Sequence, residues 1–462
     1  MKKSEKNKNN YDASKENNVA GENKSNYNVS EEKNEENKSN YNVSKESNVA
    51  GENKSNYNVY EEKPEEKNEE EKNNYNLTDL MKDEKDLPEG SYKMGFKPVT
   101  RHGYNIDEWT GAWVATALIY QIATGIILFF YYSQVNPYGS TQYIINDVPF
   151  GHIILTSHLY MAYAMIGLVY VHMMRQWFVG SYRGKWRWLQ WILGVVLFLL
   201  TITTAILGYM LANTAIAMAA LHISLILIQR SVIGLILPGS VINWIESIIV
   251  GNYTTTATFS HLLAIHVAVL STLMLAIFAV HFMLFERSGL KSEKVEKGKM
   301  IPWFPTNILY AMFSAIILVG IILIFSAAFP QVLTLAYGSL KYGSFPVPDW
   351  YITPVYKLMD VAGYGLTTGG VPLVMGVVIF ILMLPFIDRY HKSGVLERPW
   401  ITAFGVYLLI GIVVMTIWGY SQPGLTQTRL LTEYMWWSMT LISFLPVYAM
   451  RFAKRDGEFN GN

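Results

Sequence analysis

Four histidines lie within long apolar segments and form two pairs. His158 and His172 are fourteen residues apart, and His266 and His281 are fifteen residues apart. Because four turns of an α-helix take about 14.4 residues, each pair projects from one face of its own helix. The two levels are then roughly 21 Å apart along the helix axis. Two facing helices of this kind can hold two stacked flat cofactors, and two bis-histidine haems fit that geometry.

Glycines occur at the same spacing in two other segments. Gly111 and Gly125 are fourteen apart in the first apolar segment, as are Gly194 and Gly208 in the third. A glycine pair alone usually serves helix packing. In register with the histidine pairs, these glycines indicate positions where a side chain would strike a porphyrin edge. Ionisable groups inside a membrane are costly and usually functional, which favours ligation over a core role for the histidines.

The segments that must position these residues are eight apolar runs, most of which reach the roughly 20 residues needed to cross a bilayer. They begin near Trp109, Gly151, Trp188, Phe259, Trp303, Gly369, Trp400 and Glu433. The sequence therefore predicts an all-α polytopic membrane protein with eight transmembrane helices. The first four would form a bundle that holds two haems.

The chain has two parts of unlike composition. Residues 1–85 are rich in Asn, Lys, Glu and Ser, and the segment Asn18–Val29 recurs almost unchanged at Asn48–Val59. Such a stretch cannot bury enough apolar surface to offset its chain entropy, so we expect a disordered polar repeat tail. We expect a dihaem four-helix core over residues 86–295 and a C-terminal membrane domain over residues 296–462.

Charge in the connecting loops predicts the orientation. The second, fourth and sixth loops and the carboxyl end are rich in Lys and Arg, whereas the alternate loops have few cations. The positive-inside rule then places both termini in the cytoplasm of a multi-pass plasma-membrane protein. The formal net charge of +1 gives no indication of a nucleic-acid partner. Cysteine is absent, so any iron–sulfur centre must belong to another subunit.

With these histidines and glycines, several motifs resemble cytochrome b, the core subunit of the quinol-oxidising cytochrome bc and bf complexes. The likeness runs from about Gly103 to Arg455. The motif residues are Gln121–Gly125 (QIATG), Gly180–Tyr182 (GSY), Gly208-Tyr209 and Pro348–Tyr351 (PDWY), the last standing where the family has PEWY. The fifteen-residue spacing is similar to the plastoquinol-oxidising branch, although here all eight helices lie on one polypeptide.

The resemblance implies two b-type haems. His158 and His266 would ligate the low-potential haem near the outer face, and His172 and His281 the high-potential haem near the cytoplasm. Arg175 would pair with a propionate of the inner haem. With imidazoles on both axial positions, the haems would carry electrons rather than bind oxygen.

The resemblance also implies a quinol site. Asp349 stands at the glutamate that takes a quinol proton; it is one methylene shorter but can still accept a proton. Its alternative role is that of a surface loop acid. Tyr356 would border the pocket, and Tyr209 would lie between the pocket and the outer haem.

Several positions depart from the family pattern and suggest a divergent prokaryotic branch, compatible with an archaeal one. Leu211–Ala215 (LANTA) replaces LPWGQ at the outer wall of the quinol pocket. Leu155 and His261 replace two arginines that hold outer propionates; His261 could donate to a propionate or be an interfacial residue. Glu286 and Asn307 fall near the family's inner quinone ligands, or else line the cytoplasmic rim.

The leading hypothesis is therefore the cytochrome b subunit of a respiratory quinol-oxidising complex, which moves electrons across the membrane and translocates protons. Its expected partners are a Rieske-type iron–sulfur protein, a c-type cytochrome, copper protein or oxidase module, and a second copy in a homodimer. One alternative is a dihaem membrane anchor of another dehydrogenase, which usually has four or five spans and no PEWY-like loop. Another is a proton-coupled transporter, but proton relay does not explain histidines at two levels on two helices.

Overall fold

The computed structural model describes residues 98–100, 106–230, 236–252, 255–289, 300–302, 307–337, 347–362, 369–390, 394–424 and 428–460. All of them belong to one compact unit, Lys67–Asn462. The predicted tail over residues 1–85 and the predicted boundary at residues 295 and 296 lie outside the described residues, so both stay predictions.

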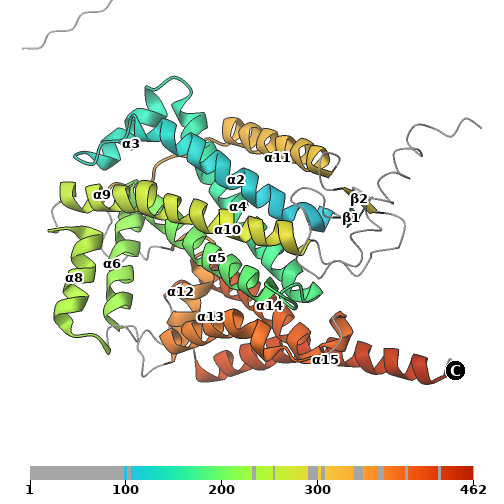
Figure 1. Cartoon of the computed structure of the whole chain (residues 1–462). Coiled ribbons are helices and arrows are strands. Elements are labelled where there is room, and N and C mark those ends of the chain that lie inside the picture. The colour runs from blue at the N-terminus through green and yellow to red at the C-terminus, as the bar shows by residue number, and fades with distance from the viewer. Residues whose placement is uncertain are drawn as a thin grey trace, which may run out of the picture. The chain divides into compact units, whose positions relative to one another are not determined.

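Four long helical segments form the N-terminal bundle. Helix α2 packs along α4, α5 packs along α10, and α4 also contacts α5 (Figure 1). Apolar side chains fill the space between the two histidine levels, among them Met161 and Met165 of α4 and Met274 of α10. The bounds are α2 (Ile106–Phe129), α4 (Gly151–Val179), α5 (Arg187–Met210) and a continuous segment made of α9 (Thr255–Ala264), the π-helix η1 (Ile265–Leu270) and α10 (Ser271–Ser288).

The fourth segment is not a regular α-helix, because η1 interrupts it at His266. A π-helical turn holds one more residue than an α-helical turn. The hydroxyl of Ser271 donates to the carbonyl of His266 at 2.9 Å, which provides that displaced carbonyl with a partner. The extra residue explains why His266 and His281 are fifteen apart while His158 and His172, on uninterrupted α4, are fourteen apart.

In the described part of the chain, five α-helices follow the bundle. Helix α11 packs on α2 and α4, α13 packs on α5, and α14 packs on α12, α15 and α4. Their bounds are α11 (Ile308–Ala328), α12 (Thr353–Ala362), α13 (Gly370–Ile387), α14 (Pro399–Ser421) and α15 (Arg429–Asn460), with a short 3₁₀ helix η3 (Val395–Glu397) before α14.

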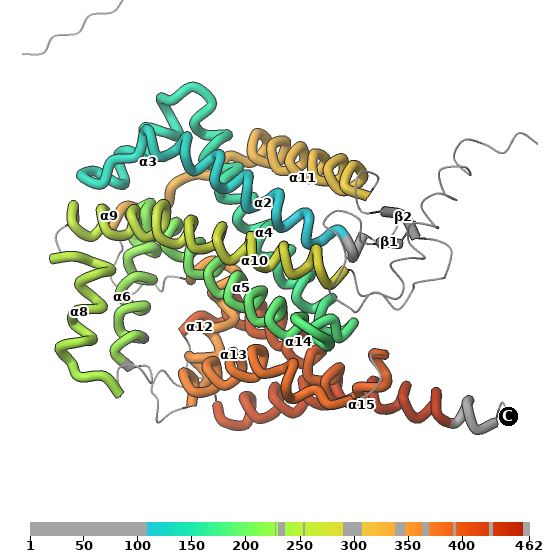
Figure 2. The backbone as a smooth tube through the Cα atoms, in the orientation of Figure 1, coloured from blue at the N-terminus to red at the C-terminus, as the bar shows by residue number. Residues whose placement is uncertain are grey.

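Smaller elements connect the long helices. α3 packs against α4, and α6 and α8 lie side by side (Figures 1 and 2). Strand β1 pairs with β2 in an antiparallel ribbon, with Val99 opposite Ile301. The bounds are α3 (Pro137–Asn146), α6 (Ala215–Arg230), α8 (Gly239–Val250), β1 (Pro98–Thr100) and β2 (Met300–Pro302).

Within the described residues, seven helices are long and apolar enough to cross a membrane. They are α2, α4, α5, the α9–η1–α10 segment, α11, α13 and α14. The eighth predicted span coincides with α15, which is long but less apolar than the others. The predicted helical membrane fold is therefore confirmed, whereas the count of eight spans stays a prediction.

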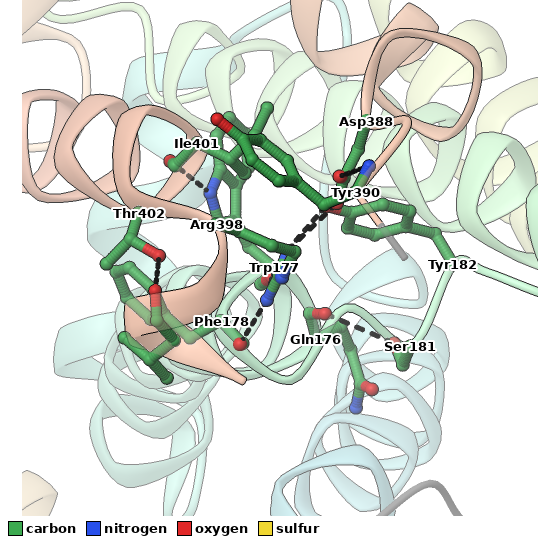
Figure 3. Close-up of polar contacts among 11 residues, drawn as sticks. Gln176, Trp177, Phe178, Ser181, Tyr182, Asp388, Tyr390, Arg398, Ile401 and Thr402 are labelled. Carbon is green, nitrogen blue, oxygen red and sulfur yellow. Dashed lines mark hydrogen bonds and ion pairs between the residues drawn. The ribbon is translucent and has the colours of Figure 1, made fainter. Parts of the chain in front are cut away.

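A buried ion pair between α13 and α14 is hydrogen-bonded to residues at the end of α4 and just after it, and so connects the C-terminal helices to the bundle (Figure 3). Arg398, at the start of α14, lies 3.1 Å from Asp388, and neither side chain is exposed. Arg398 also donates to the carbonyls of Trp177 and Phe178 at the end of α4, and Tyr182 donates to Asp388 at 2.7 Å. We refer to Tyr182, Asp388 and Arg398 as the junction cluster.

Gly180 makes this approach possible. Its φ of +63° is one that residues with a side chain rarely adopt, and a Cβ there would lie 3.1 Å from Arg398 Cζ. The glycine of the GSY motif therefore serves both the turn after α4 and the close approach of the arginine.

Candidate functional site

The four predicted ligand histidines lie half-buried inside the bundle, and each ring has a partner at Nδ1. On α4, His158 Nδ1 lies 2.8 Å from Thr124 Oγ1, and His172 Nδ1 lies 3.0 Å from Thr110 Oγ1. The other two rings contact backbone carbonyls of α5 instead. His266 Nδ1 lies 2.9 Å from Thr204 O, and His281 Nδ1 lies 2.9 Å from Gln190 O.

For His158, His266 and His281, these partners determine which ring nitrogen carries the proton. A carbonyl oxygen can only accept, so Nδ1 of His266 and of His281 must be the donor. The hydroxyl of Thr124 donates to Tyr120 O at 2.8 Å, so its oxygen is left to accept from His158 Nδ1. In a neutral imidazole with hydrogen on Nδ1, the lone pair is on Nε2, which is the arrangement that metal-ligating histidines show.

The four glycines lie directly against these rings. A Cβ on Gly111 would be 3.2 Å from His172 Cε1, and one on Gly125 would be 3.4 Å from His158 Cε1. On α5, the corresponding distances are 3.1 Å from Gly194 to His281 and 2.8 Å from Gly208 to His266. The glycines thus lie against the imidazoles, and their clearance of a porphyrin edge stays a prediction.

A cavity of about 440 Å³ lies at the inner histidine level. Its wall includes His172 and His281, so these histidines of α4 and α10 border one shared space. At the outer level, His158 and His266 are close enough to interact electrostatically. The remaining wall of the inner cavity is mostly apolar and aromatic, with Val169, Phe198, Phe278 and Phe282 among its residues. Its volume and lining are typical of a site for a largely apolar ligand, so the residues present fit a flat apolar cofactor with two axial imidazoles.

Polar residues at the rim of this cavity differ in part from those predicted. The residues that line it, all within the described part of the chain, include Arg187 and Asn307 but not Arg175 or Glu286. Arg187 is buried and donates to Ser288 O and Gly289 O. Asn307 accepts from Trp109 Nε1 at 3.5 Å. Among the described arginines, Arg187 is thus the one that lines the inner cavity. From the sequence it was predicted only as part of a cationic loop.

Asp349 lies in a tight turn that α12 holds in place. The backbone N–H groups of Ile352 and Thr353 donate to Asp349 O at 2.9 and 3.0 Å. The buried hydroxyl of Thr353 donates to Pro348 O at 2.8 Å. Because these bonds tie residues 348 and 349 to residues 352 and 353, the backbone that carries the aspartate side chain is held in one conformation.

Around the carboxylate of Asp349 the structure brings together four tyrosines. Tyr163 of α4 donates to Asp349 Oδ2 at 2.9 Å. Tyr209 of α5 and Tyr351 of the turn are close enough to interact with it electrostatically, as is Tyr420 of α14. Burial raises the pKa of the Asp349 carboxyl, and the hydrogen bond from Tyr163 acts in the opposite direction. The group is therefore partly desolvated and faced by phenols, unlike an ordinary surface acid.

Other predicted residues of the outer side are placed as follows. Tyr356 is buried in α12, within two turns of Asp349. The LANTA segment pairs with the chain after α11, through a bridge from Thr214 to Ala336 and a bond from Ala215 N to Leu335 O. His261 Nδ1 lies 2.7 Å from Ile248 O, so this ring is bound to α8. That contact favours a packing role for His261 over a propionate role.

Sequence reasoning missed Tyr163, Thr110 and Thr124. The sequence does mark the threonines, because each directly precedes one of the two glycines that are fourteen residues apart on α2. On α5 the corresponding acceptors are the carbonyls of the residues four positions before each glycine, Gln190 and Thr204. No residue type marks those two carbonyls in the sequence.

Comparison with known proteins identifies the family. The N-terminal family model, cytochrome b(N-terminal)/b6/petB, matches residues 163–336, and the C-terminal model, cytochrome b(C-terminal)/b6/petD, matches residues 344–441. A solved structure described as a hyperthermophilic respiratory Complex III has a TM-score of 0.61 and 20% identity, and covers 77% of this chain and 91% of that one. At that identity the structural likeness shows the fold alone.

Relatives agree with the family models. A cytochrome b of Sulfolobus acidocaldarius is 32% identical over 364 residues, which cover 70% of this chain and 63% of that protein. The match thus spans less than two thirds of that relative. A cytochrome bc complex cytochrome b subunit of Chlorobaculum thiosulfatiphilum is 25% identical over 337 residues, which cover 71% of this chain and 76% of that protein. Together with the two family models, these matches show that the chain belongs to the cytochrome b family.

Proposed function

We propose that the chain is the haem-binding, quinol-oxidising subunit of a respiratory cytochrome bc-type complex. The observation that carries the proposal is the pairing of four imidazoles inside the bundle across two helices, each with a partner at Nδ1. In this proposal, His158 and His266 hold a low-potential b haem and His172 and His281 a high-potential one. When bound, the haems supply one-electron transfer across the membrane.

The chain's own residues would act on the quinol at the outer side. Oxidation of one quinol releases two protons and two electrons. Asp349 would accept one proton, with Tyr209 and Tyr356 as the aromatic wall of the pocket. A Rieske-type iron–sulfur partner would take one electron and the haem chain the other. This division needs a carboxylate that stays near the bundle, and the fixed turn around Asp349 supports it.

The remaining features of the proposal concern location and partners. Helix composition and family membership make the chain an integral membrane protein. We propose the plasma membrane with both termini in the cytoplasm, because the loops that follow His172 and His281 in the sequence are rich in Lys and Arg. Further proposed partners are a second copy of the chain and a c-type cytochrome, copper protein or oxidase module. Quinone reduction at the inner cavity would use its polar rim, Asn307 and Arg187.

A difference spectrum of the purified chain, reduced minus oxidised, tests this proposal. We expect b-type absorbance from two haems per chain, and His172→Ala should remove the inner haem. His222→Ala is the matched control, because that histidine lies on α6 beside Tyr337 and outside the bundle. Absence of b-type haem from the wild-type chain would reject the proposal and leave the transporter alternative. Haem without quinol oxidation in the assembled complex would favour a dihaem anchor.

A further inference from the structure

Tyr163 lies where the haem bundle meets the quinol-site turn. It is on α4, five residues after His158, and its hydroxyl donates to Asp349 Oδ2 at 2.9 Å. The phenol ring packs edge-on against Trp350 at 6.5 Å and tilted against Tyr351 at 6.1 Å. One side chain of the bundle therefore contacts three of the four PDWY residues.

The surroundings leave the second oxygen of Asp349 available. The titratable groups that face this carboxylate from the described elements are Tyr163 of α4, Tyr209 of α5, Tyr351 of the turn and Tyr420 of α14. All four are phenols, which are neutral near pH 7. No hydrogen bond from a described residue reaches Asp349 Oδ1, whereas Oδ2 is bound to Tyr163.

We propose that Tyr163 is a positioning residue that fixes one oxygen of Asp349 and turns the other toward the quinol. The inference rests on the proposed function and adds a residue to it. In the step concerned, a quinol O–H bond breaks and its proton passes to Asp349 Oδ1, while Tyr163 keeps its own proton. The proton of the second O–H bond passes to water at the outer side, and the two electrons leave the quinol, one for the iron–sulfur partner and one for the haem chain. A held carboxylate compensates for a side chain that is one methylene shorter than glutamate.

The hydrogen bond also has an electrostatic effect. Donation to a carboxylate favours its charged form, whereas burial favours the neutral form. Loss of the Tyr163 hydroxyl therefore raises the pKa of Asp349 further. Because only the carboxylate can accept the quinol proton, quinol oxidation is lost as pH falls through this pKa. A higher pKa moves that loss to higher pH.

The test is the pH profile of quinol oxidation by the assembled complex, with a short-chain analogue of the quinone extracted from the host membrane. Tyr163→Phe keeps the ring contacts and removes only the hydroxyl. We expect the acid limb of kcat to move up by about one pH unit, which is roughly a tenfold loss of rate below the limb. KM and the haem spectrum should change little.

Tyr160→Phe is the matched control. Tyr160 is on the same helix and stacks on Tyr163 at 6.4 Å, but its hydroxyl donates to Phe329 O at 2.7 Å. The pH profile of quinol oxidation by Tyr160→Phe should match that of the wild type. In an Asp349→Asn background, Tyr163→Phe should have no further effect on the rate, because the group that it positions no longer ionises.

A second variant keeps the proposal testable if the phenylalanine form assembles poorly. Tyr163→Gln retains a hydrogen-bond donor without the phenol and should keep the acid limb closer to that of the wild type than Tyr163→Phe does. Coincident profiles for wild type and Tyr163→Phe, or equal shifts for Phe and Gln, overturn the role of Tyr163 alone. A wild-type complex that does not oxidise quinol overturns the proposed function itself.

Discussion

Each of the four imidazoles has a glycine against Cε1 and a hydrogen-bond partner at Nδ1, and together these contacts leave its ring little freedom. For His266 the contacts come from one helix, since Gly208 and the carbonyl of Thr204 are both on α5. The ring orientation is thus fixed by the protein before any cofactor binds. Supports of this kind are worth about 10- to 100-fold in metal affinity at other metal sites.

Gly208→Ala tests this support at the outer level. The new Cβ would lie 2.8 Å from His266 Cε1, and the ring cannot turn away without losing its bond to Thr204 O. Crowding of this kind costs about 1–3 kcal/mol, or roughly 5- to 150-fold in haem affinity. We expect the outer site to bind haem more weakly than the inner site when the variant is titrated with haem and the haem bound per chain is measured.

Gly167→Ala is the control for that variant. Gly167 is on α4, and a Cβ there would meet nothing within 4 Å. Alanine is also the better helix former, so the haem content should equal that of the wild type. Equal haem retention by both variants would contradict the view that the glycines make room for the rings.

The residues of the site could be predicted from the sequence to different extents. The alignment of glycines with histidines was predictable because residues fourteen apart lie on the same face of any regular α-helix, nearly four turns apart. The carbonyls of Gln190 and Thr204 were not, since every residue supplies a carbonyl. The contact of Tyr163 with Asp349 joins residues 186 positions apart, and only the packing of α4 beside the turn reveals it.

At the scale of the element, the π-helix reconciles two unequal spacings. On a straight α-helix, fifteen residues are only close to four turns. The structure instead gives the extra residue to η1, so the ligands of the two helices are separated by nearly the same rotation. π-Turns of this kind often occur at functional sites.

Deletion of Ala268 tests that account. Ala268 is exposed within η1, so its removal costs little packing. We expect the segment to become a regular α-helix with His266 and the second ligand fourteen apart, and both haems to remain bound. Deletion of Val171, exposed on uninterrupted α4, should rotate its two ligands by about 100° relative to each other and cost one haem. Loss of haem from both deletions, measured by difference spectra, would contradict this account.

At the scale of the whole molecule, the chain follows the pattern that its apolar runs predict. Eight helices begin within a few residues of the predicted positions, because runs of about 20 apolar residues have few alternatives to helix in lipid. What the runs do not reveal is how the bundle attaches to the later helices. That attachment depends on buried charges, which hydropathy places in loops.

The junction cluster yields a prediction about stability. Arg398→Met would leave Asp388 buried without its charged partner, and breaking a buried pair typically costs about 3–5 kcal/mol. Arg429→Met breaks an exposed pair with Glu433, which water screens, and should change the stability little. Thermal unfolding in detergent should show a clearly lower melting temperature for Arg398→Met only. Equal melting temperatures would mean that the cluster contributes little to the attachment.

Tyr182 belongs both to the junction cluster and to the wall of the inner cavity. Its partner carboxylate is more than two hundred residues further along the chain, so it leaves the ribosome long after the bundle has been made. Until then, Tyr182 in the cavity wall lacks the hydrogen bond that holds it. We therefore expect a cofactor to enter the cavity more easily during synthesis than after this hydrogen bond has formed.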